Sequence, residues 1–237
     1  IFEDVLSKSE VVCTTNIGAG HFTLSNRKFP IILIDEATQA TEPSSLVPIV
    51  KGARQLILVG DHKQLPPTVT SRTAESSGLN ISLFDRLQKN GLKAHMLTTQ
   101  YRMHPTIREF PSARFYENRL EDGCRAEDRP PVAGFLWPDW DRPVAFIPVH
   151  GSEIEEEAGS SRSNMDEAAV VLQVVKDLLL PGDLDVQDIG VISPYAGQVR
   201  LIREMLGEDL QSLEIKSVDG YQGREKEVII FSTVRAN

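Results

Sequence analysis

Two adjacent carboxylates, Asp35 and Glu36, follow an apolar run in the stretch IILIDEATQA, residues 31 to 40. One carboxylate in such a position can hold a hydrated Mg²⁺ ion, and the other can orient and deprotonate an attacking water. A solvated acidic turn after a strand explains the same pair if it stands alone. The pair therefore indicates phosphoryl chemistry only if other polar residues gather at the same place.

A second apolar run ends in the same way, because QLILVG (55–60) is followed at once by DHKQLPP (61–67). Gln64 can donate a hydrogen bond to a phosphate oxygen, and the two prolines stiffen the chain behind it. Ligands of open α/β sheets bind beyond the carboxyl ends of the strands. Two consecutive strand ends of this kind predict a site for the γ-phosphate of a nucleotide.

Two later stretches supply complementary groups, TTQYRMHP (98–105) and SVDGYQGREKEVII (217–230). Arg102 can neutralise charge on a transferring phosphoryl group, and Tyr101 can stack on a base. Glycines such as Gly223 let the backbone approach a ligand, and Glu225 can accept a hydrogen bond from a ribose hydroxyl. Taken alone, a Tyr-Arg pair is explained by surface packing and a salt bridge, and a glycine-containing loop is a weak signal.

The elements that must position these residues are short apolar runs rich in Val and Ile, which we interpret as parallel strands covered on both faces. Helical patterns at 82–90, 163–180 and 196–206 lie between several of them, and Asn164 with Glu167 predicts a helix cap. This alternation predicts an α/β protein with parallel sheets. The expected strands are 11–15, 31–35, 55–60, 95–99, 144–149, 189–193, 213–218 and 228–234.

A break in composition near 98–105 predicts a boundary between two α/β lobes, 1–98 and 99–237. Residues 117–143 are interpreted as a long surface loop or a small insertion, and the acidic segment 151–163 as a mobile one. The first residues resemble the end of a helix, so we expect the chain to begin inside a larger protein.

The composition sets limits on function. The net charge of −9 argues against a general basic face for nucleic acid, although a local groove can still be positive. No run approaches eighteen apolar residues, so we expect no membrane span. Two cysteines, Cys13 and Cys124, make neither a disulfide framework nor a metal site, which favours an intracellular setting.

In their order along the chain, these stretches resemble the motifs of Upf-like superfamily-1 helicases, the group of the nonsense-mediated-decay, senataxin-type and Dna-two/Nam-seven proteins. The motifs GDHKQLPP and QYRMHP are highly specific to this group, and the resemblance covers nearly the whole chain. It implies two RecA-like lobes of a P-loop NTPase helicase core, with ATP and Mg²⁺ between them and single-stranded RNA or DNA across their top. The six matching stretches are VCTTNIGAG (12–20), IDEATQA (34–40), VGDHKQLPP (59–67), QYRMHP (100–105), ISPYAGQ (192–198) and VDGYQGREKEVII (218–230).

For the first lobe, the resemblance implies that Asp35 holds Mg²⁺, Glu36 is the catalytic base and Gln64 senses the γ-phosphate. Thr14 and Thr15 are implied to lie along the nucleic-acid track and to contact the strand's backbone.

For the second lobe, the resemblance implies that Tyr101 stacks on adenine and Arg102 touches the γ-phosphate. Glu225 is implied to bind ribose, with Gly223 beside it. Pro194 and Tyr195 are implied to continue the nucleic-acid track.

The sequence also departs from the family pattern. No G-x-x-x-x-G-K-[ST] phosphate loop occurs in the 237 residues, and the last helicase motif is absent after VRAN. We therefore expect a fragment that lacks useful ATPase activity by itself. The alternative is a non-catalytic module that uses the helicase fold to bind nucleic acid or a protein partner.

Overall fold

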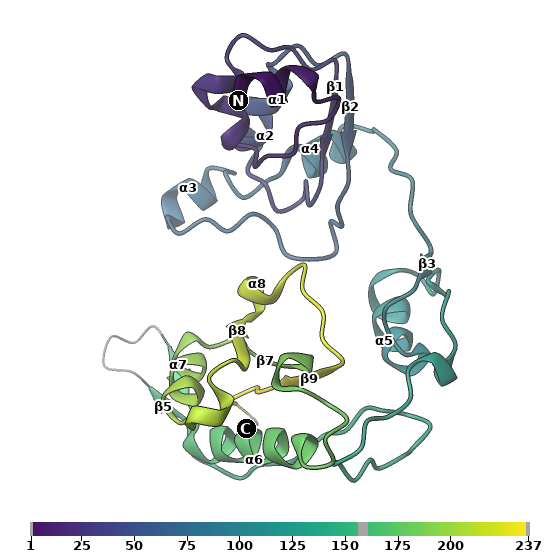
Figure 1. Cartoon of the computed structure of the whole chain (residues 1–237), viewed down its shortest axis with the longest axis vertical. Coiled ribbons are helices and arrows are strands. Elements are labelled where there is room, and N and C mark those ends of the chain that lie inside the picture. Colours follow the sequence, from purple (N-terminus) through teal and green to yellow (C-terminus); the bar gives the residue numbers. More distant parts are fainter. Residues whose placement is uncertain (1, 156–160, 236–237) are drawn as a thin grey trace. The chain divides into compact units, whose positions relative to one another are not determined.

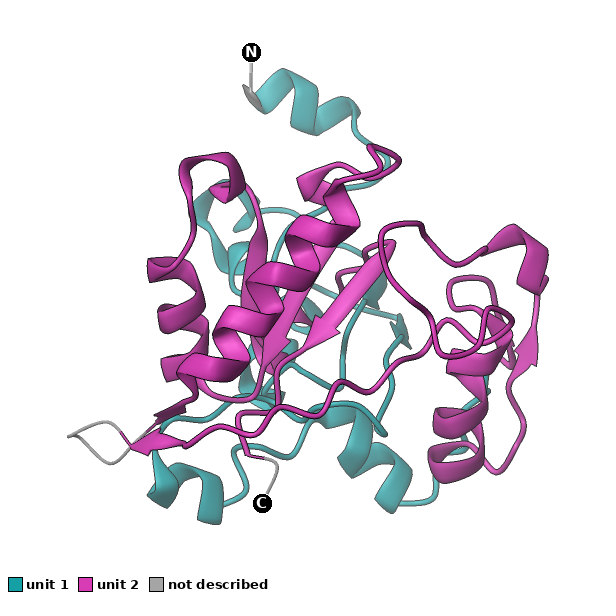
Figure 2. Cartoon of the chain, turned by 90° about the horizontal axis from the view of Figure 1, so that it is seen from below, with its two compact units in different colours: residues 1–96 teal, residues 97–237 magenta. Residues whose placement is uncertain are grey.

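The computed structural model describes residues 2–155 and 161–235, and it divides the chain into two compact units, residues 1–96 and 97–237 (Figure 2). The boundary predicted from composition lies two residues further along, between 98 and 99. The expected mobile segment 151–163 falls partly outside the described residues.

Unit 1 contains a two-stranded parallel sheet, β1 (Ile31–Ile34) and β2 (Gln55–Leu58), joined by the helix α2 (Glu42–Ile49) (Figure 1). Its other α-helices are α1 (Phe2–Lys8), α3 (Arg72–Ser76) and α4 (Leu83–Lys89), and short 3₁₀ turns lie at Gly18–Gly20 and Phe22–Leu24. A small core forms around Ile32, Ile34 and Ala37.

Unit 2 is built on a three-stranded parallel sheet in the order β8-β7-β9, with β7 (Ile189–Ser193) in the centre. The edge strands are β8 (Glu214–Ser217) and β9 (Val228–Phe231). The long helix α6 (Met165–Leu179) and the helix α7 (Ala196–Glu204) bury Val175 and Ile202 against this sheet, and both side chains are fully enclosed. This core is the larger of the two units' cores and holds the loops at the strand ends in place.

The rest of unit 2 comprises smaller elements. The short parallel pair β3 (Thr99–Gln100) and β4 (Glu121–Asp122) flanks the helix α5 (Pro105–Phe115). The antiparallel pair β5 (Ile154–Glu155) and β6 (Arg162–Ser163) precedes α6, and the four-residue helix α8 (Val218–Tyr221) follows β8. Short 3₁₀ turns lie at Ala126–Asp128, Val186–Asp188 and Glu208–Leu210.

The predicted α/β class with parallel strands is confirmed, and so are the strands that begin at Ile31, Gln55 and Ile189. The helix cap is also present, because the Asn164 side chain accepts a hydrogen bond from the amide of Glu167 at 3.0 Å. These strands and this helix cap depend on residues that are close together in the sequence, which explains why they could be predicted from the sequence alone.

Three predicted strands are wrong. Residues 11–15 and 144–149 form no strand, and of 95–99 only Thr99 is paired. Pro148 removes a backbone donor in the middle of the second run. In the first run, Thr15 instead starts a turn, since its hydroxyl accepts from the amide of Gly18 at 3.0 Å.

The expectation of strands covered on both faces holds for β7 but is wrong for β1, where Ile31 and Leu33 are 58% and 60% exposed. The two-stranded sheet of unit 1 buries only the alternate residues Ile32 and Ile34. Side chains alternate across a strand, so a sheet packed on one side leaves every second apolar residue in solvent.

Candidate nucleotide and nucleic-acid site

The two strand ends of unit 1 are joined beyond the strands themselves. The amide of Val59 donates to the carbonyl of Ile34 at 2.9 Å, and the amide of Ala37 donates to the carbonyl of Val59 at 2.8 Å. At Gly60, an added Cβ would lie 3.0 Å from the amide nitrogen of Thr38. Only a glycine allows these two segments of the chain to approach this closely without a shift. The predicted residues after β1 and β2 therefore share one edge of the sheet.

Asp35 and Glu36 are both exposed at this edge. Glu36 has a left-handed backbone (φ 50°), and its amide donates to Asp35 Oδ1 at 3.0 Å. Its carboxylate accepts from Gln39 Nε2 at 2.6 Å. A positive φ is uncommon for a residue with a side chain, and such residues concentrate at functional sites.

These carboxylates fit a magnesium ion that keeps most of its waters. The described residues contain no cluster of three or more His, Cys, Asp or Glu side chains that could hold a metal. Mg²⁺ commonly takes one or two carboxylates and completes its shell with water and phosphate oxygens. The donor set at the end of β1 is of this kind.

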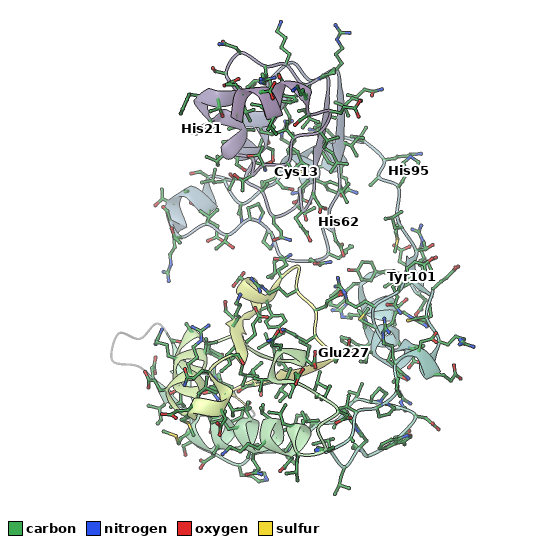
Figure 3. All side chains as sticks on the ribbon, in the orientation of Figure 1. Cys13, His21, His62, His95, Tyr101 and Glu227 are labelled. Carbon is green, nitrogen blue, oxygen red and sulfur yellow. The ribbon has the colours of Figure 1, made fainter. Side chains whose placement is uncertain are left out.

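Gln64 lies on the loop after β2 and is held by Asp61 (the loop is seen near His62 in Figure 3). Its Nε2 donates to Asp61 Oδ2 at 2.9 Å, and the amide of Lys63 donates to Asp61 Oδ1 at 2.9 Å. The side chain of Gln64 is exposed, so this contact orients it without burying it. Asp61 is a further carboxylate at the same edge whose role the sequence did not indicate.

Unit 2 brings together two predicted residues that are 123 positions apart. Arg102 Nε donates to Glu225 Oε2, and both side chains are more than 60% exposed. The contact joins the segment between β3 and α5 to the segment between α8 and β9. An exposed ion pair of this sort contributes little stability, so either group can take a ligand instead at small cost.

Gln100, which the sequence did not single out, organises the segment that carries Arg102. Its Oε1 accepts from the amides of Arg102 and Met103 at 2.9 and 2.7 Å. Its Nε2 donates to the carbonyl of Met103 at 2.9 Å and to Asp122 Oδ1 at 2.8 Å. Asp122 in turn forms a two-point ion pair with Arg108. The Arg108 guanidinium, and then Gln100, lower the pKa of Asp122 below its usual value.

Tyr101 is 68% exposed and lies over Gly123, where an added Cβ would come within 2.2 Å of the ring (Tyr101 is labelled in Figure 3). Arg129 donates to the carbonyls of Tyr101 and Arg102 at 3.3 and 3.0 Å. One face of the ring is therefore supported by backbone while the side chain stays accessible. Gly223 has φ 76°, a conformation that favours glycine over other residues.

The residues predicted to contact nucleic acid lie on exposed turns. Thr14 and Thr15 are exposed in unit 1, before the 3₁₀ turn at Gly18. Pro194 is exposed and Tyr195 half-buried in unit 2, where they link β7 to α7. A hydrogen bond to the Tyr195 side chain is the main cause that raises the pKa of Arg235.

A buried polar network lies behind the Pro194–Tyr195 turn. The Gln198 side chain is fully enclosed, accepts from the amide of Asn164 at 2.8 Å and donates to Ser232 Oγ at 3.0 Å. Ser232 Oγ donates to Glu167 Oε1 at 3.0 Å. Buried polar groups that are all hydrogen-bonded fix one arrangement of the elements they join. Here they join α6, α7 and the end of β9. Asn164, Glu167 and Gln198 stand in stretches that the sequence analysis singled out, but their contact with one another was not predicted.

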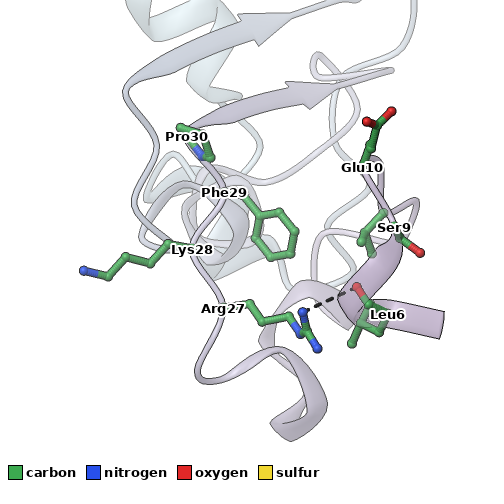
Figure 4. Close-up of a pocket in the computed structure, with 8 residues that line it drawn as sticks. Leu6, Ser9, Glu10, Arg27, Lys28, Phe29 and Pro30 are labelled. Atoms are coloured by element: carbon green, nitrogen blue, oxygen red, sulfur yellow. Dashed lines mark hydrogen bonds between the residues drawn. The ribbon is translucent and has the colours of Figure 1, made fainter. Parts of the chain in front are cut away.

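A cavity of about 380 Å³ in unit 1 lies away from these residues (Figure 4). It is lined by the end of α1 and by the segment Arg27–Pro30, and Arg27 Nη1 donates to the carbonyl of Leu6 at 3.4 Å. Pro30 precedes β1, so this cavity is at the amino end of the strand. Asp35 and Glu36 are at the carboxyl end, where α/β sheets bind ligands.

Comparison of the sequence with known proteins identifies the family. Two family models, each described as an AAA domain, match residues 1–72 and 79–237. The chain belongs to this AAA-domain family and has its RecA-like α/β fold.

Within the family its relatives are Upf-like helicases. The "Regulator of nonsense transcripts 1 homolog" of Drosophila melanogaster is 45% identical over 240 residues, which are 98% of this chain and 20% of that protein. The "ATP-dependent helicase NAM7" of Saccharomyces cerevisiae is 45% identical over 242 residues, 99% of this chain and 25% of the relative. The "ATP-dependent helicase upf1" of Schizosaccharomyces pombe is 40% identical over 245 residues, which are 99% of this chain and 26% of that protein. The chain thus spans about a fifth to a quarter of these relatives, and the resemblance to the Upf-like group is confirmed.

Proposed function

We propose that this chain is a fragment of the core of an ATP-dependent, superfamily-1 helicase that couples Mg-ATP hydrolysis to movement on single-stranded RNA or DNA. The main support is the hydrogen-bonded edge of unit 1, which carries Asp35, Glu36 and Gln64 beyond neighbouring parallel strands. Relatives named as ATP-dependent helicases match 99% of the chain.

In this proposal, Asp35 holds Mg²⁺, which supplies charge neutralisation to the phosphates when bound. Glu36 takes a proton from the attacking water, and its carboxylate is already oriented by Gln39. Gln64 donates to the γ-phosphate after leaving Asp61, to which it is hydrogen-bonded here.

We also propose nucleotide-binding roles for residues of unit 2. Tyr101 stacks on adenine, and Gly223 allows the backbone to approach the nucleotide. Arg102 and Glu225 neutralise each other in the structure. Nucleotide binding would separate them, so that Arg102 turns to the γ-phosphate and Glu225 to the ribose. Because both side chains are solvent-exposed, breaking their contact costs little.

The proposed nucleic-acid contacts are Thr14, Thr15, Pro194 and Tyr195. They would touch the backbone of the strand, which gives little sequence preference and an affinity that falls with salt. None of the described helices is long and apolar enough to cross a membrane. We propose an intracellular setting, cytoplasmic or nuclear.

A chimaera tests the catalytic roles. This chain replaces the matching segment of the Drosophila melanogaster relative, whose flanking parts are expected to supply the phosphate loop. We expect ATP hydrolysis stimulated by single-stranded RNA. Glu36→Gln should keep ATP binding and abolish hydrolysis, because it preserves shape and removes the base. The control Glu75→Gln, on α3, should hydrolyse ATP normally.

Other outcomes of the same experiment are informative. Equal loss of ATP binding and hydrolysis in Glu36→Gln would assign Glu36 a structural role. Arg102→Ala should lower hydrolysis more than it weakens nucleic-acid affinity. A folded chimaera that binds strands but never hydrolyses ATP would favour the non-catalytic module.

The 237-residue chain alone should show no useful ATP turnover, because it contains no glycine-rich loop to hold the triphosphate. Loss of an arginine finger by itself lowers the rate by about 10³ to 10⁵. Phosphate release with single-stranded RNA measures this directly. Turnover near that of a complete relative would contradict the expectation.

A further inference from the structure

A second cavity, of about 370 Å³, lies in unit 2 between α7, β8 and α8, which are neighbours in Figure 1. Three cationic side chains line it: Arg200, Arg203 and Lys216. Its other lining residues include Val199, Ser217 and Gly220, so the walls between the cations are small or apolar. A cavity with this lining suits a compact anion.

The positive charge beside this cavity is only partly compensated. Lys216 forms an ion pair with Glu214 at 3.0 Å, but Glu214 is shared with Arg224 and Lys226 at 2.5 and 3.4 Å. The pKa of Glu214 is lowered by its hydrogen bond to Lys216 first and by Lys226 and Arg224 after it. One carboxylate faces three cations, so this corner of an acidic chain carries local positive charge.

Arg203 is held in place by a contact with a backbone carbonyl, which leaves its charge uncompensated at that contact. Its Nη2 donates to the carbonyl of Ile215, on the edge strand β8. A carbonyl is neutral, and a guanidinium has five N–H donors, so this bond leaves further donors for a ligand. A guanidinium fixed in this way is suited to phosphate oxygens.

Gly220 lies close to two other lining residues of the cavity. A Cβ added to Gly220 would lie 3.3 Å from Ser217 Oγ and 3.5 Å from Lys216 Cβ. Ala196 also lines the cavity and directly follows Pro194 and Tyr195 in the chain. One lining residue of the cavity is thus adjacent in sequence to a turn for which we propose contact with nucleic acid.

We propose that this cavity holds a backbone phosphate of single-stranded nucleic acid through Arg203 and Lys216. The inference rests on the proposed function and extends it to residues that no helicase motif includes. Lysine and arginine contacts to phosphate give affinity and position on the strand without reading its sequence. A positive pocket also explains how a chain with a net charge of −9 can bind a polyanion.

The test measures binding of a fluorescein-labelled oligouridylate to the 237-residue chain by fluorescence anisotropy over a series of salt concentrations. We expect Lys216→Gln to weaken binding about three- to tenfold at low salt, as loss of one charge contact would. The slope of log K against log salt should decrease in magnitude by about 0.7, the value for one phosphate of a single strand.

Lys226→Gln is the matched control. It removes the same charge and another partner of Glu214, but Lys226 does not line the cavity. At physiological salt its affinity should change less than that of Lys216→Gln, because Lys226 does not line the cavity and acts on a phosphate there only through a partly screened field. Arg203→Gln should behave as Lys216→Gln does, and circular dichroism should verify that all variants fold.

The outcomes separate the two proposals. If the chain binds the strand and Lys216→Gln matches Lys226→Gln in affinity and slope, the cavity proposal is overturned and the proposed function stands. If the chain does not bind the strand under any salt condition, both fail.

A second measurement does not depend on variants. In heteronuclear NMR, the strand should shift the Gly220 amide and the Arg203 Nε–H signals, and inorganic phosphate should shift the same signals more weakly. Shifts with inorganic phosphate but none with the strand would show a site for free anions and overturn the assignment to nucleic acid. Absence of both shifts would overturn the site itself.

Discussion

Replacing Gln100 by Ala should release the segment that presents Tyr101 and Arg102. The side chain accepts two hydrogen bonds from backbone amides and donates to the carbonyl of Met103 and the carboxylate of Asp122, with a weaker contact to Cys124 Sγ at 3.8 Å. A net contribution of about 0.5 to 1.5 kcal/mol for each bond, reduced because Gln100 is only half-buried, predicts a loss of about 2 to 4 kcal/mol. The loss should be local, since the core of α6, α7 and β7 does not include Gln100.

Hydrogen exchange of the Arg102 and Met103 amides measures this loss, because both amides donate to Gln100 Oε1. A local loss of about 2 kcal/mol would accelerate their exchange roughly thirtyfold. The control is Gln173→Ala on α6, where an exposed hydrogen bond to Asp177 is lost and about 0.5 kcal/mol or less is expected. Unchanged exchange at Arg102 and Met103 in Gln100→Ala would refute the view that Gln100 organises this segment.

Three further predictions concern single positions. Tyr221→Phe should raise the free energy of unfolding by about 1 kcal/mol, because the buried hydroxyl of Tyr221 has no hydrogen-bond partner among the described residues. Burial also raises the pKa of this hydroxyl to about 12. Urea unfolding measures the change, and a destabilised variant would contradict the prediction. Gly60→Ala should destabilise unit 1 by about 1 to 3 kcal/mol, since the new methyl would meet Thr38 at 3.0 Å, and faster exchange of the Ala37 amide would report it. The lowered pKa of Asp122 stabilises the fold above the unfolded pKa of 3.8, and this stabilisation is lost as pH falls through the folded pKa. Asp122→Asn should therefore lower stability at neutral pH and flatten its decline in acid, and equal acid sensitivity of both proteins would show that Asp122 plays no part.

The sequence identified the strand ends of unit 1 because the signal there is local. An apolar run followed by a carboxylate places Asp35 at the carboxyl end of β1 whatever the rest of the chain does. The same reasoning failed at 144–149, where an apolar run of similar composition has no partner strand among the described residues and contains Pro148. Periodicity alone does not reveal whether a neighbour exists to complete a sheet.

The groups that hold the site were harder to predict from sequence. Gln100 stands next to the singled-out Tyr101, but its partner Asp122 is 22 residues away in a segment interpreted as a surface loop. The contact between Arg102 and Glu225 spans 123 residues, and either residue could have been assigned a ligand without reference to the other. Such pairings depend on tertiary structure, which a single sequence does not display.

We propose that the polar residues beyond these strands bind a magnesium nucleotide. The most direct test is an NMR titration of the isotope-labelled chain with Mg-ATP at millimolar concentration, following backbone amides. We expect shifts at residues 35–37, 60–64, 101–103 and 223–225 that decrease when Mg²⁺ is removed. Shifts confined to the cavity around Leu6 and Arg27, or shifts that do not depend on Mg²⁺, would contradict the assignment.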